Sequence, residues 1–182
     1  YDTVTEVMWV TGAALFIRLA DYREVGGLDG HFFAHMEEID LCWRLRSRGK
    51  KLVCIPQSVV YHVGGATLKK ENPRKTFLNF RNNLLMLYKN LPDKELEHVL
   101  FIRGILDRVA ALVFYLKKDR ANARAVMQAR REFEDIRYSF AASRIENMMK
   151  STDEIIPERT HFSIVMKYYL LGKKHFSQLK LF

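Results

Sequence analysis

The order of apolar and polar residues changes character near residue 92. Before that point, strand-like apolar runs cover residues 6–18 and 50–62, and helical spacing covers residues 37–48 and 76–91. Runs rich in strand formers and bounded by turn residues favour β-strands, whereas apolar residues three or four apart favour helices. We therefore expect the first half of the chain to alternate strands and helices.

Beyond residue 92 the apolar spacing is helical throughout. A first apolar stripe runs from Leu96 to Leu116, a charged helix is expected over about residues 120–149, and a last stripe runs from Phe162 to Leu179. The simplest interpretation of the first stripe is packing in a core. The last stripe alternates with lysines, a pattern typical either of a helix lying on a membrane surface or of a dimer interface.

Composition and charge narrow the class of protein only partly. The chain has 182 residues, of which 48% are hydrophobic and 28% charged, which is ordinary for a globular protein. The longest apolar run, Val109–Leu116, is far shorter than the roughly 20 residues that cross a bilayer. Cys42 and Cys54 show no disulfide or metal-site spacing, which favours a reducing, cytoplasmic location.

The net charge of +9 suits phosphate-bearing ligands, nucleic acid or anionic lipid, and does not choose among them. The chain opens on Tyr1 almost directly in a strand-like run and lacks an initiator methionine. We therefore expect it to be a fragment of a longer protein, with an N-terminal part upstream.

Three acids, Glu37, Glu38 and Asp40, crowd the start of the helix predicted over residues 37–48, directly after an aromatic-rich turn. Acids in a first turn complement the helix dipole, which explains the charge order without any function. A carboxylate at a helix start also stays ionised, as a general base must. From spacing alone, complementing the helix dipole is a better explanation of the three acids than a catalytic role.

The run "TGAALFIRLADYREVGGLDGHFFAHMEEIDLCWRLRSRGKKLVCIPQSVVYHVGG" changes that balance. It resembles the C-terminal half of the catalytic domain of family-two glycosyltransferases, which have the GT-A fold. The shared parts are a Gly-Ala strand, a glycine- and aromatic-rich turn, a Glu-Asp-x-Asp-Leu-x-x-Arg helix start, a basic strand entry, a proline and a late histidine. The resemblance covers about residues 8–92. It implies an α/β fold, with residues 1–92 as the acceptor-side half and residues 93–182 as a helical extension.

The resemblance implies roles for the three acids. Glu38 falls on the family's catalytic base, usually Asp, which deprotonates the acceptor hydroxyl in an inverting displacement. Glu37 falls on the family's Glu and Asp40 on the second Asp of the motif, so the resemblance makes both of them candidate catalytic residues beside Glu38. We expect Asp40 to help cap the helix or to pair with Arg44, four residues on.

Four further residues are candidates for binding roles. The late histidine, His62, completes a divalent metal site in several relatives, and Mn²⁺ or Mg²⁺ is expected in a complete enzyme. A strand-end histidine is the equal alternative. Gly12 and Trp9 are assigned to the acceptor pocket, against a bulge and a core indole as alternatives. Arg81, with Asn82 next to it, is assigned to a donor diphosphate or a lipid headgroup, against a solvated basic face as the alternative.

The function implied is transfer of a sugar from a nucleotide-sugar donor to a hydroxyl of a glycan or lipid-linked acceptor, in polysaccharide or cell-envelope biosynthesis. The family's metal-binding Asp-x-Asp motif is missing from the sequence, so we expect the fragment to be inactive alone and to bind no metal tightly. We expect a cytoplasmic protein, peripheral on the membrane or dimeric. The main alternative is a non-catalytic basic membrane-surface module. A nucleic-acid binder ranks last, because no known binding module is recognisable.

Overall fold

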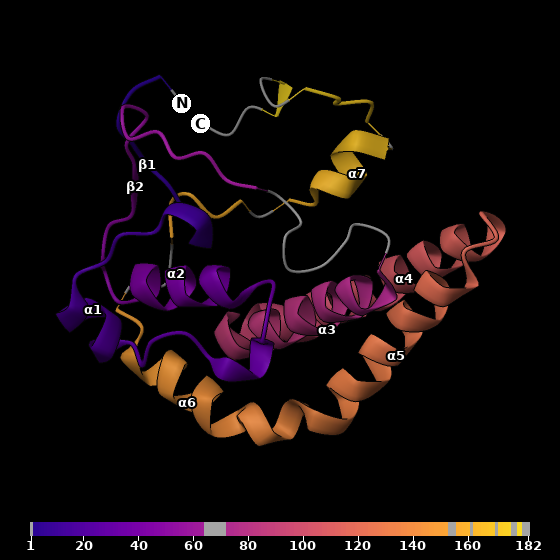
Figure 1. The fold of residues 1–182 in the computed structure, drawn as a ribbon. Helices are drawn as coiled ribbons and strands as arrows, with labels where there is room; N and C mark the ends of the chain where they lie inside the picture. Colours follow the sequence, from indigo (N-terminus) through magenta and orange to yellow (C-terminus); the bar gives the residue numbers. More distant parts are fainter. Residues whose placement is uncertain are drawn as a thin grey trace.

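The structure is a computed structural model that describes residues 2–63, 72–152, 156–160, 162–169, 171–175 and 178–179. Within these residues it is mostly helical, with one small sheet near the N-terminal end (Figure 1). The long helices α3, α4 and α5 form one side of the molecule, and α2 lies over the C-terminal part of α3. None of the described helices is both long enough and apolar enough to span a membrane.

The elements follow one another without a second sheet in the described ranges. The first half holds β1 (Thr5–Glu6), a 3-10 turn at Gly12–Ala14, α1 (Leu19–Glu24), a 3-10 turn at Gly30–Phe32, α2 (Glu37–Ser47), β2 (Val53–Cys54) and α3 (Pro73–Asn90). The second half holds α4 (Asp93–Leu116), α5 (Arg120–Ile136), a 3-10 turn at Arg137–Phe140, α6 (Ala141–Lys150) and α7 (Ile164–Tyr169).

The sheet is much smaller than the sequence predicts. Strands β1 and β2 pair antiparallel over two residues each, with Thr5 opposite Cys54 and Glu6 opposite Val53. The prediction of strands over residues 6–18 and 50–62 is therefore wrong for most of these residues. A strand needs neighbouring strands and a buried face to be stable, and side chains such as Ile55 and Val60 stay half-exposed or more here.

Helix α2 confirms the helix predicted over residues 37–48. Its last residue is Ser47, and Gly49 follows the end of the helix as expected, with a φ of +74° that glycine adopts without strain. The N–H of Lys50 donates to the carbonyl of Leu45 and closes the last turn. One face of α2 buries Leu41 and Leu45 against Val25, which fixes the helix against the preceding turn.

One hydrophobic core joins the two halves of the chain. Phe32 and Trp43 from the first half pack with Leu84 and Leu85 of α3. The same cluster contains Phe133, Phe140 and Ile156 from beyond residue 92. The predicted boundary at residue 92 therefore does not separate two cores, and α3 is the shared central element.

The helical extension departs from prediction in two respects. The helix expected over residues 120–149 is divided into α5 and α6 by a 3-10 turn, so that the chain bends around α3 (Figure 1). The first stripe is only partly a core stripe. Leu96 and Leu100 are buried, but Leu112 and Leu116, at the far end of α4, are exposed.

Helix α6 is fastened to the end of α3 by buried polar side chains. The Arg144 guanidinium donates to the carbonyls of Tyr88 and Leu91 and to the carboxylate of Asp93. The Asn147 amide nitrogen donates to the carbonyl of Lys89 at 3.3 Å. These bonds satisfy carbonyls at a helix C-terminus that have no partner within the helix.

Replacing Arg144 should therefore loosen the extension. We expect Arg144→Met to lower the free energy of unfolding by about 2–4 kcal/mol, because buried carbonyls lose a charged donor. Urea denaturation followed by circular dichroism measures this. Arg131→Met, at an exposed site on α5, is the matched control and should change the value little. Equal stability of the two variants would contradict the fastening role.

Candidate active site

The turn before α2 holds an unusual backbone. Phe33, His35 and Met36 have φ values of 61°, 71° and 74°, in the region that non-glycine residues rarely occupy. Such residues cost of order 1–3 kcal/mol each and persist only where the surroundings impose them. The turn delivers the chain to Glu37, the first residue of α2, so this backbone sets the direction of the acids that follow.

A single buried amide holds the turn in place. The side-chain nitrogen of Asn82, which has no exposed surface, donates to the carbonyls of Phe32, Ala34 and His35, each at 2.8 Å. Its neighbour Arg81 donates to the carbonyl of His31 at 2.9 Å. Helix α3 therefore imposes the conformation of the turn.

The turn and the start of α2 bring together polar atoms that have no partner among the described residues. These are Glu37 Oε2, Glu38 Oε2 and His35 Nε2, all buried from solvent. A Cβ built on Gly12 would lie 3.8 Å from the Cβ of Glu38. The structure thus places the predicted acceptor glycine beside the predicted base, and a buried acceptor oxygen without a partner favours binding a donor group.

The surroundings of Glu37 make its carboxylate harder to ionise than a carboxylate in water, so its pKa is raised. Burial raises the pKa of Glu37, and the Glu38 carboxylate adds to the effect; the backbone N–H of Glu37 and His35 act in the opposite direction. Two adjacent carboxylates in one half-buried place repel each other. The arrangement can accept or share a proton from a hydroxyl that approaches it.

Asp40 plays a different part from the other two acids. Its side chain has no exposed surface, and its carboxylate accepts hydrogen bonds from Arg44 at 2.8 Å, Lys89 at 3.0 Å and Asn90 at 2.7 Å. The expected pair with Arg44 is confirmed. The catalytic assignment of Asp40 finds no support in this geometry, because all of its bonding capacity faces inward.

Lys89 links this network to the glycine-rich turn. Its ammonium group lies 2.7 Å from Asp29 and 5.0 Å from the centre of the Phe32 ring. Burial alone would raise the pKa of Asp29, but the hydrogen bonds from Lys89 and from the backbone N–H of His31 outweigh it and lower the pKa to about 2. Asp29 therefore stays ionised and keeps the turn attached to α3.

Sequence reasoning missed the buried network that the polar residues of α3 form. Asn82, Lys89 and Asn90 lie on the buried side of the helix. The sequence did contain a signal. Lys89 and Asn90 come seven and eight positions after Asn82, which is about two helical turns, inside an otherwise apolar stripe. Polar residues at core spacing indicate a buried network, although they do not name their partners.

The remaining predicted site residues fall in different places. Trp9 is 47% exposed and so is not the core indole of the alternative interpretation. Arg81 is engaged by Glu132 at 2.7 Å and by the turn, which leaves its predicted diphosphate role without structural support. His62 is exposed. Among the described residues no group of three or more histidine, cysteine, aspartate or glutamate side chains is arranged to hold a metal ion.

Comparison with known proteins shows what these residues resemble. The chain is 31% identical, over 141 residues, to the pre-mycofactocin glycosyltransferase of Mycobacterium tuberculosis, a match that covers 71% of this chain and 29% of that protein. It is 38% identical, over 56 residues, to the N-acetylglucosaminyl-diphospho-decaprenol L-rhamnosyltransferase of the same organism. It is 36% identical, over 61 residues, to the rhamnosyltransferase WbbL of Escherichia coli. The last two matches cover 31% and 34% of this chain and 18% and 22% of those proteins.

This chain is a relative of the glycosyltransferases. The resemblance to a family-two, GT-A-type enzyme is consistent with these matches. The chain spans less than a third of the length of the curated relatives it matches. No protein-family model matches it, and no solved structure matches it significantly.

The buried network makes a prediction for Asp40. We expect Asp40→Asn to lower the free energy of unfolding by about 3–5 kcal/mol, because Arg44 and Lys89 then lose a buried counter-charge. Chemical denaturation measures this directly. Glu38→Gln should change stability by no more than about 1 kcal/mol, since the carboxylate oxygen Oε2 of Glu38 has no partner to lose among the residues that the structure describes. A similar loss in both variants would show that Asp40 has no special structural role.

The low pKa of Asp29 makes a prediction about pH. Because the folded-state pKa of about 2 lies below the unfolded value, Asp29 contributes stability above about pH 4 and loses it as the pH falls toward 2. At pH 7, Asp29→Asn should cost about 1–2 kcal/mol, and the difference from the unmodified chain should vanish near pH 2. Glu97→Gln, an exposed acid of α4, is the control. A pH-independent difference would refute the link to ionisation.

Proposed function

We propose that the complete protein transfers a sugar from a nucleotide-activated donor to a hydroxyl of a glycan or lipid-linked acceptor. The observation that carries the proposal is the buried carboxylate oxygen of Glu38, which has no hydrogen-bond partner among the described residues and belongs to a side chain whose Cβ lies beside Gly12, in a chain related to glycosyltransferases. One relative is named for an acceptor that carries a diphospho-decaprenol. That name supports a lipid-linked acceptor.

Glu38 acts as the general base in this proposal. Its carboxylate takes the proton of the acceptor hydroxyl while the hydroxyl oxygen forms a bond to the anomeric carbon of the donor sugar. The bond from that carbon to the nucleoside diphosphate breaks, and the diphosphate departs with the electron pair. Attack opposite to the leaving group inverts the anomeric configuration. General-base assistance of this kind contributes typically 10²–10⁴-fold.

The neighbouring residues position the base and the acceptor. Gly12 is exposed and has no side chain, so an acceptor sugar can approach Glu38 closely. Trp9, three residues earlier and half-exposed, offers a ring face for stacking on that sugar. Asn82 and Asp40 hold the turn and the helix, so that the Glu38 carboxylate is already placed before substrate arrives.

A divalent ion, Mn²⁺ or Mg²⁺, would supply charge neutralisation for the departing diphosphate when bound. His62 is proposed as one ligand, by resemblance to the late histidine of relatives. The described residues do not group further ligands around it, so they do not by themselves fit a metal centre. The steps assigned here are therefore those of the chain's own residues.

The alternative function is a non-catalytic basic module at a membrane surface. The net charge of +9 and the exposed apolar side chains of α7 favour it. It gives no reason for a strained turn followed by two carboxylates whose buried oxygens lack a partner among the described residues, one of them on a side chain beside Gly12. Catalysis explains that arrangement, and the two functions are compatible in one protein.

The assignment of Glu38 predicts a kinetic effect. In the complete protein, Glu38→Gln should lower turnover by roughly 10²–10⁴ and leave donor binding nearly unchanged, because an amide cannot accept the proton. Release of nucleoside diphosphate, from whichever nucleotide sugar in a panel supports turnover, measures the rate. Glu24→Gln, on the exposed end of α1, is the matched control and should retain full activity. Wild-type turnover in Glu38→Gln would exclude the role.

A further inference from the structure

Helix α4 exposes an apolar stripe that the rest of the described structure leaves uncovered. Six large side chains are between 43% and 70% exposed: Phe101, Ile105, Val109, Leu112, Val113 and Leu116. Their spacing of three, four and seven residues places them on one face of the helix. At 1.5 Å per residue the stripe is about 22 Å long. Scattered apolar residues are ordinary on a surface, but a continuous stripe indicates a binding surface.

The stripe is not the result of a loosely attached helix. The opposite face of α4 buries Leu96, Leu100 and Ala111. Between Leu100 and Ala111, the buried carboxylate of Asp107 accepts a hydrogen bond from Arg130 of α5 at 2.9 Å and forms an ion pair with Arg103, also at 2.9 Å. Helix α4 is thus fixed to α5 by an ion-pair network and by packing. The exposed stripe is a second, outward-facing surface of a helix whose core contacts are already made.

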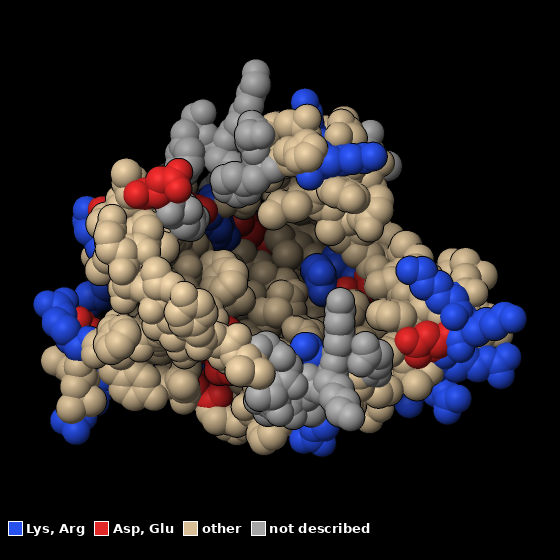
Figure 2. Space-filling model, turned by 45° about the horizontal axis from the view of Figure 1, so that its top comes forward, with Lys and Arg blue, Asp and Glu red and all other residues tan. Residues whose placement is uncertain are grey.

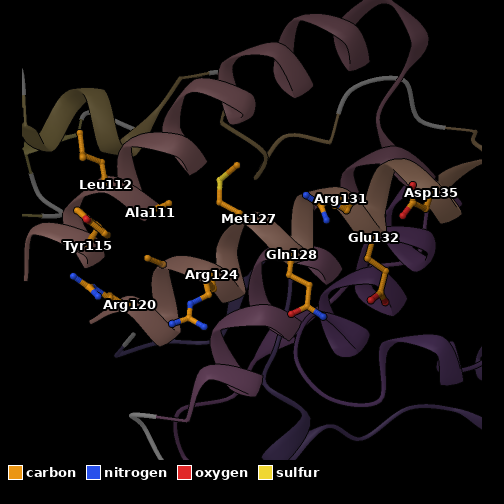
Figure 3. Close-up of a pocket in the computed structure, with 11 residues that line it drawn as sticks. Ala111, Leu112, Tyr115, Arg120, Arg124, Met127, Gln128, Arg131, Glu132 and Asp135 are labelled. Carbon is orange, nitrogen blue, oxygen red and sulfur yellow. The ribbon is translucent and has the colours of Figure 1, made fainter. Parts of the chain in front are cut away.

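A hollow of about 860 Å³ adjoins the stripe between α4 and α5. Figure 3 shows Leu112 and Tyr115 on α4 at one end of it, with Met127 beside them. Arg120, Arg124 and Arg131 follow one another along α5 on the same side. The hollow therefore combines apolar side chains, of which Leu112 belongs to the stripe, with a row of three guanidinium groups, and two acids, Glu132 and Asp135, line its other end.

Further cations lie at the turn that joins α4 to α5. Lys117 and Lys118 are exposed there, and Lys and Arg side chains gather at this right-hand end of the molecule in Figure 2. The nearest acids are already engaged in part. Asp119 caps α5 through Asn122, and Glu132 pairs with Arg81. The end of the α4–α5 hairpin therefore carries an excess of positive charge next to apolar side chains.

We propose that this surface, the hairpin surface formed by the α4 stripe and the cationic hollow, docks on an anionic lipid bilayer. The stripe enters the interface between headgroups and acyl chains, and the arginines and lysines contact lipid phosphates. An apolar face flanked by cations is the pattern of helices that lie in a membrane interface. Charge complementarity selects this occupant, because a second copy of the chain would present the same cations to these cations.

The hairpin surface differs from the one expected from the sequence, which was the last stripe from Phe162 to Leu179. The hairpin surface gives the predicted peripheral membrane location a specific binding face, and it does not depend on the proposed glycosyl-transfer chemistry. Transfer to a lipid-linked acceptor would be favoured by this docking, since the enzyme and its substrate would lie on the same membrane surface. Binding to vesicles can be measured without turnover, so failure of this inference and failure of the Glu38 assignment are distinguishable.

Vesicle co-sedimentation of the 182-residue chain tests the proposal. We expect binding to phosphatidylcholine vesicles that contain phosphatidylglycerol, little binding to phosphatidylcholine alone, and weakening when NaCl rises from about 0.1 to about 0.5 M. The combined variant Lys117→Ala, Arg120→Ala and Arg124→Ala should bind anionic vesicles roughly 100-fold more weakly, given the usual contribution of each basic residue near such a surface.

The apolar stripe needs a variant of its own. Phe101→Gln, Ile105→Gln and Leu112→Gln together should weaken binding at least about tenfold and remove the part that persists at high salt. Circular dichroism confirms that each variant is folded. These side chains are exposed, so the fold should tolerate the changes.

Two controls decide the outcome. Arg18→Ala, Arg23→Ala and Lys51→Ala remove the same charge from the opposite end of the molecule and should leave binding within about threefold. Tyr168→Gln with Tyr169→Gln tests α7 and should also have little effect. The proposal is overturned if the chain binds no anionic vesicle. It is also overturned if the triple variant of Arg18, Arg23 and Lys51 loses as much vesicle affinity as the triple variant of Lys117, Arg120 and Arg124, or if only the variant of Tyr168 and Tyr169 loses affinity. Light scattering that shows a dimer dissociated by the stripe variant would assign the surface to a second copy instead.

Discussion

The buried carboxylate of Asp40 is the group on which the rest of the first half depends. A charge without solvent access is strongly destabilising unless it is paired and fully hydrogen-bonded. Arg44 therefore has to lie against it, and the same guanidinium reaches the carbonyls of Val25 and Gly27. Lys89 supplies the second positive charge and extends to Asp29. One carboxylate thus fixes α2, the glycine-rich turn and α3 relative to one another.

The helical extension completes the same network from the other side. Asn147 of α6 donates to the side-chain oxygen of Asn90 at 3.2 Å, and Asn90 is itself a partner of Asp40. Together with the shared core around Phe133 and Phe140, this contact makes the extension part of the scaffold that holds the candidate site. A change in how the extension packs would therefore alter the position of the start of α2 through α3, without direct contact between the extension and Glu38.

The candidate site and the proposed membrane surface are joined by the same helices. Helix α3 holds the strained turn through Asn82, and α5 packs along α3 while lining the cationic hollow. An acceptor held at the membrane would meet an enzyme oriented by its hairpin surface. The orientation follows from rigid helix packing, because the ion pairs of Asp107 and the core contacts leave α4 no independent position.

The sequence by itself determined the local features of this protein. Helical spacing located α2, α3 and α4 to within a few residues, Gly49 marked the end of α2, and the motif placed Glu37 and Glu38 at a helix start. Spacing is a local property, so it can be read without a partner. Only the tertiary structure decided which faces were covered. It buried Asn82 and Lys89, left the outer face of α4 exposed, and reduced the predicted strands to one short pair, because burial and strand pairing depend on segments far apart in the chain.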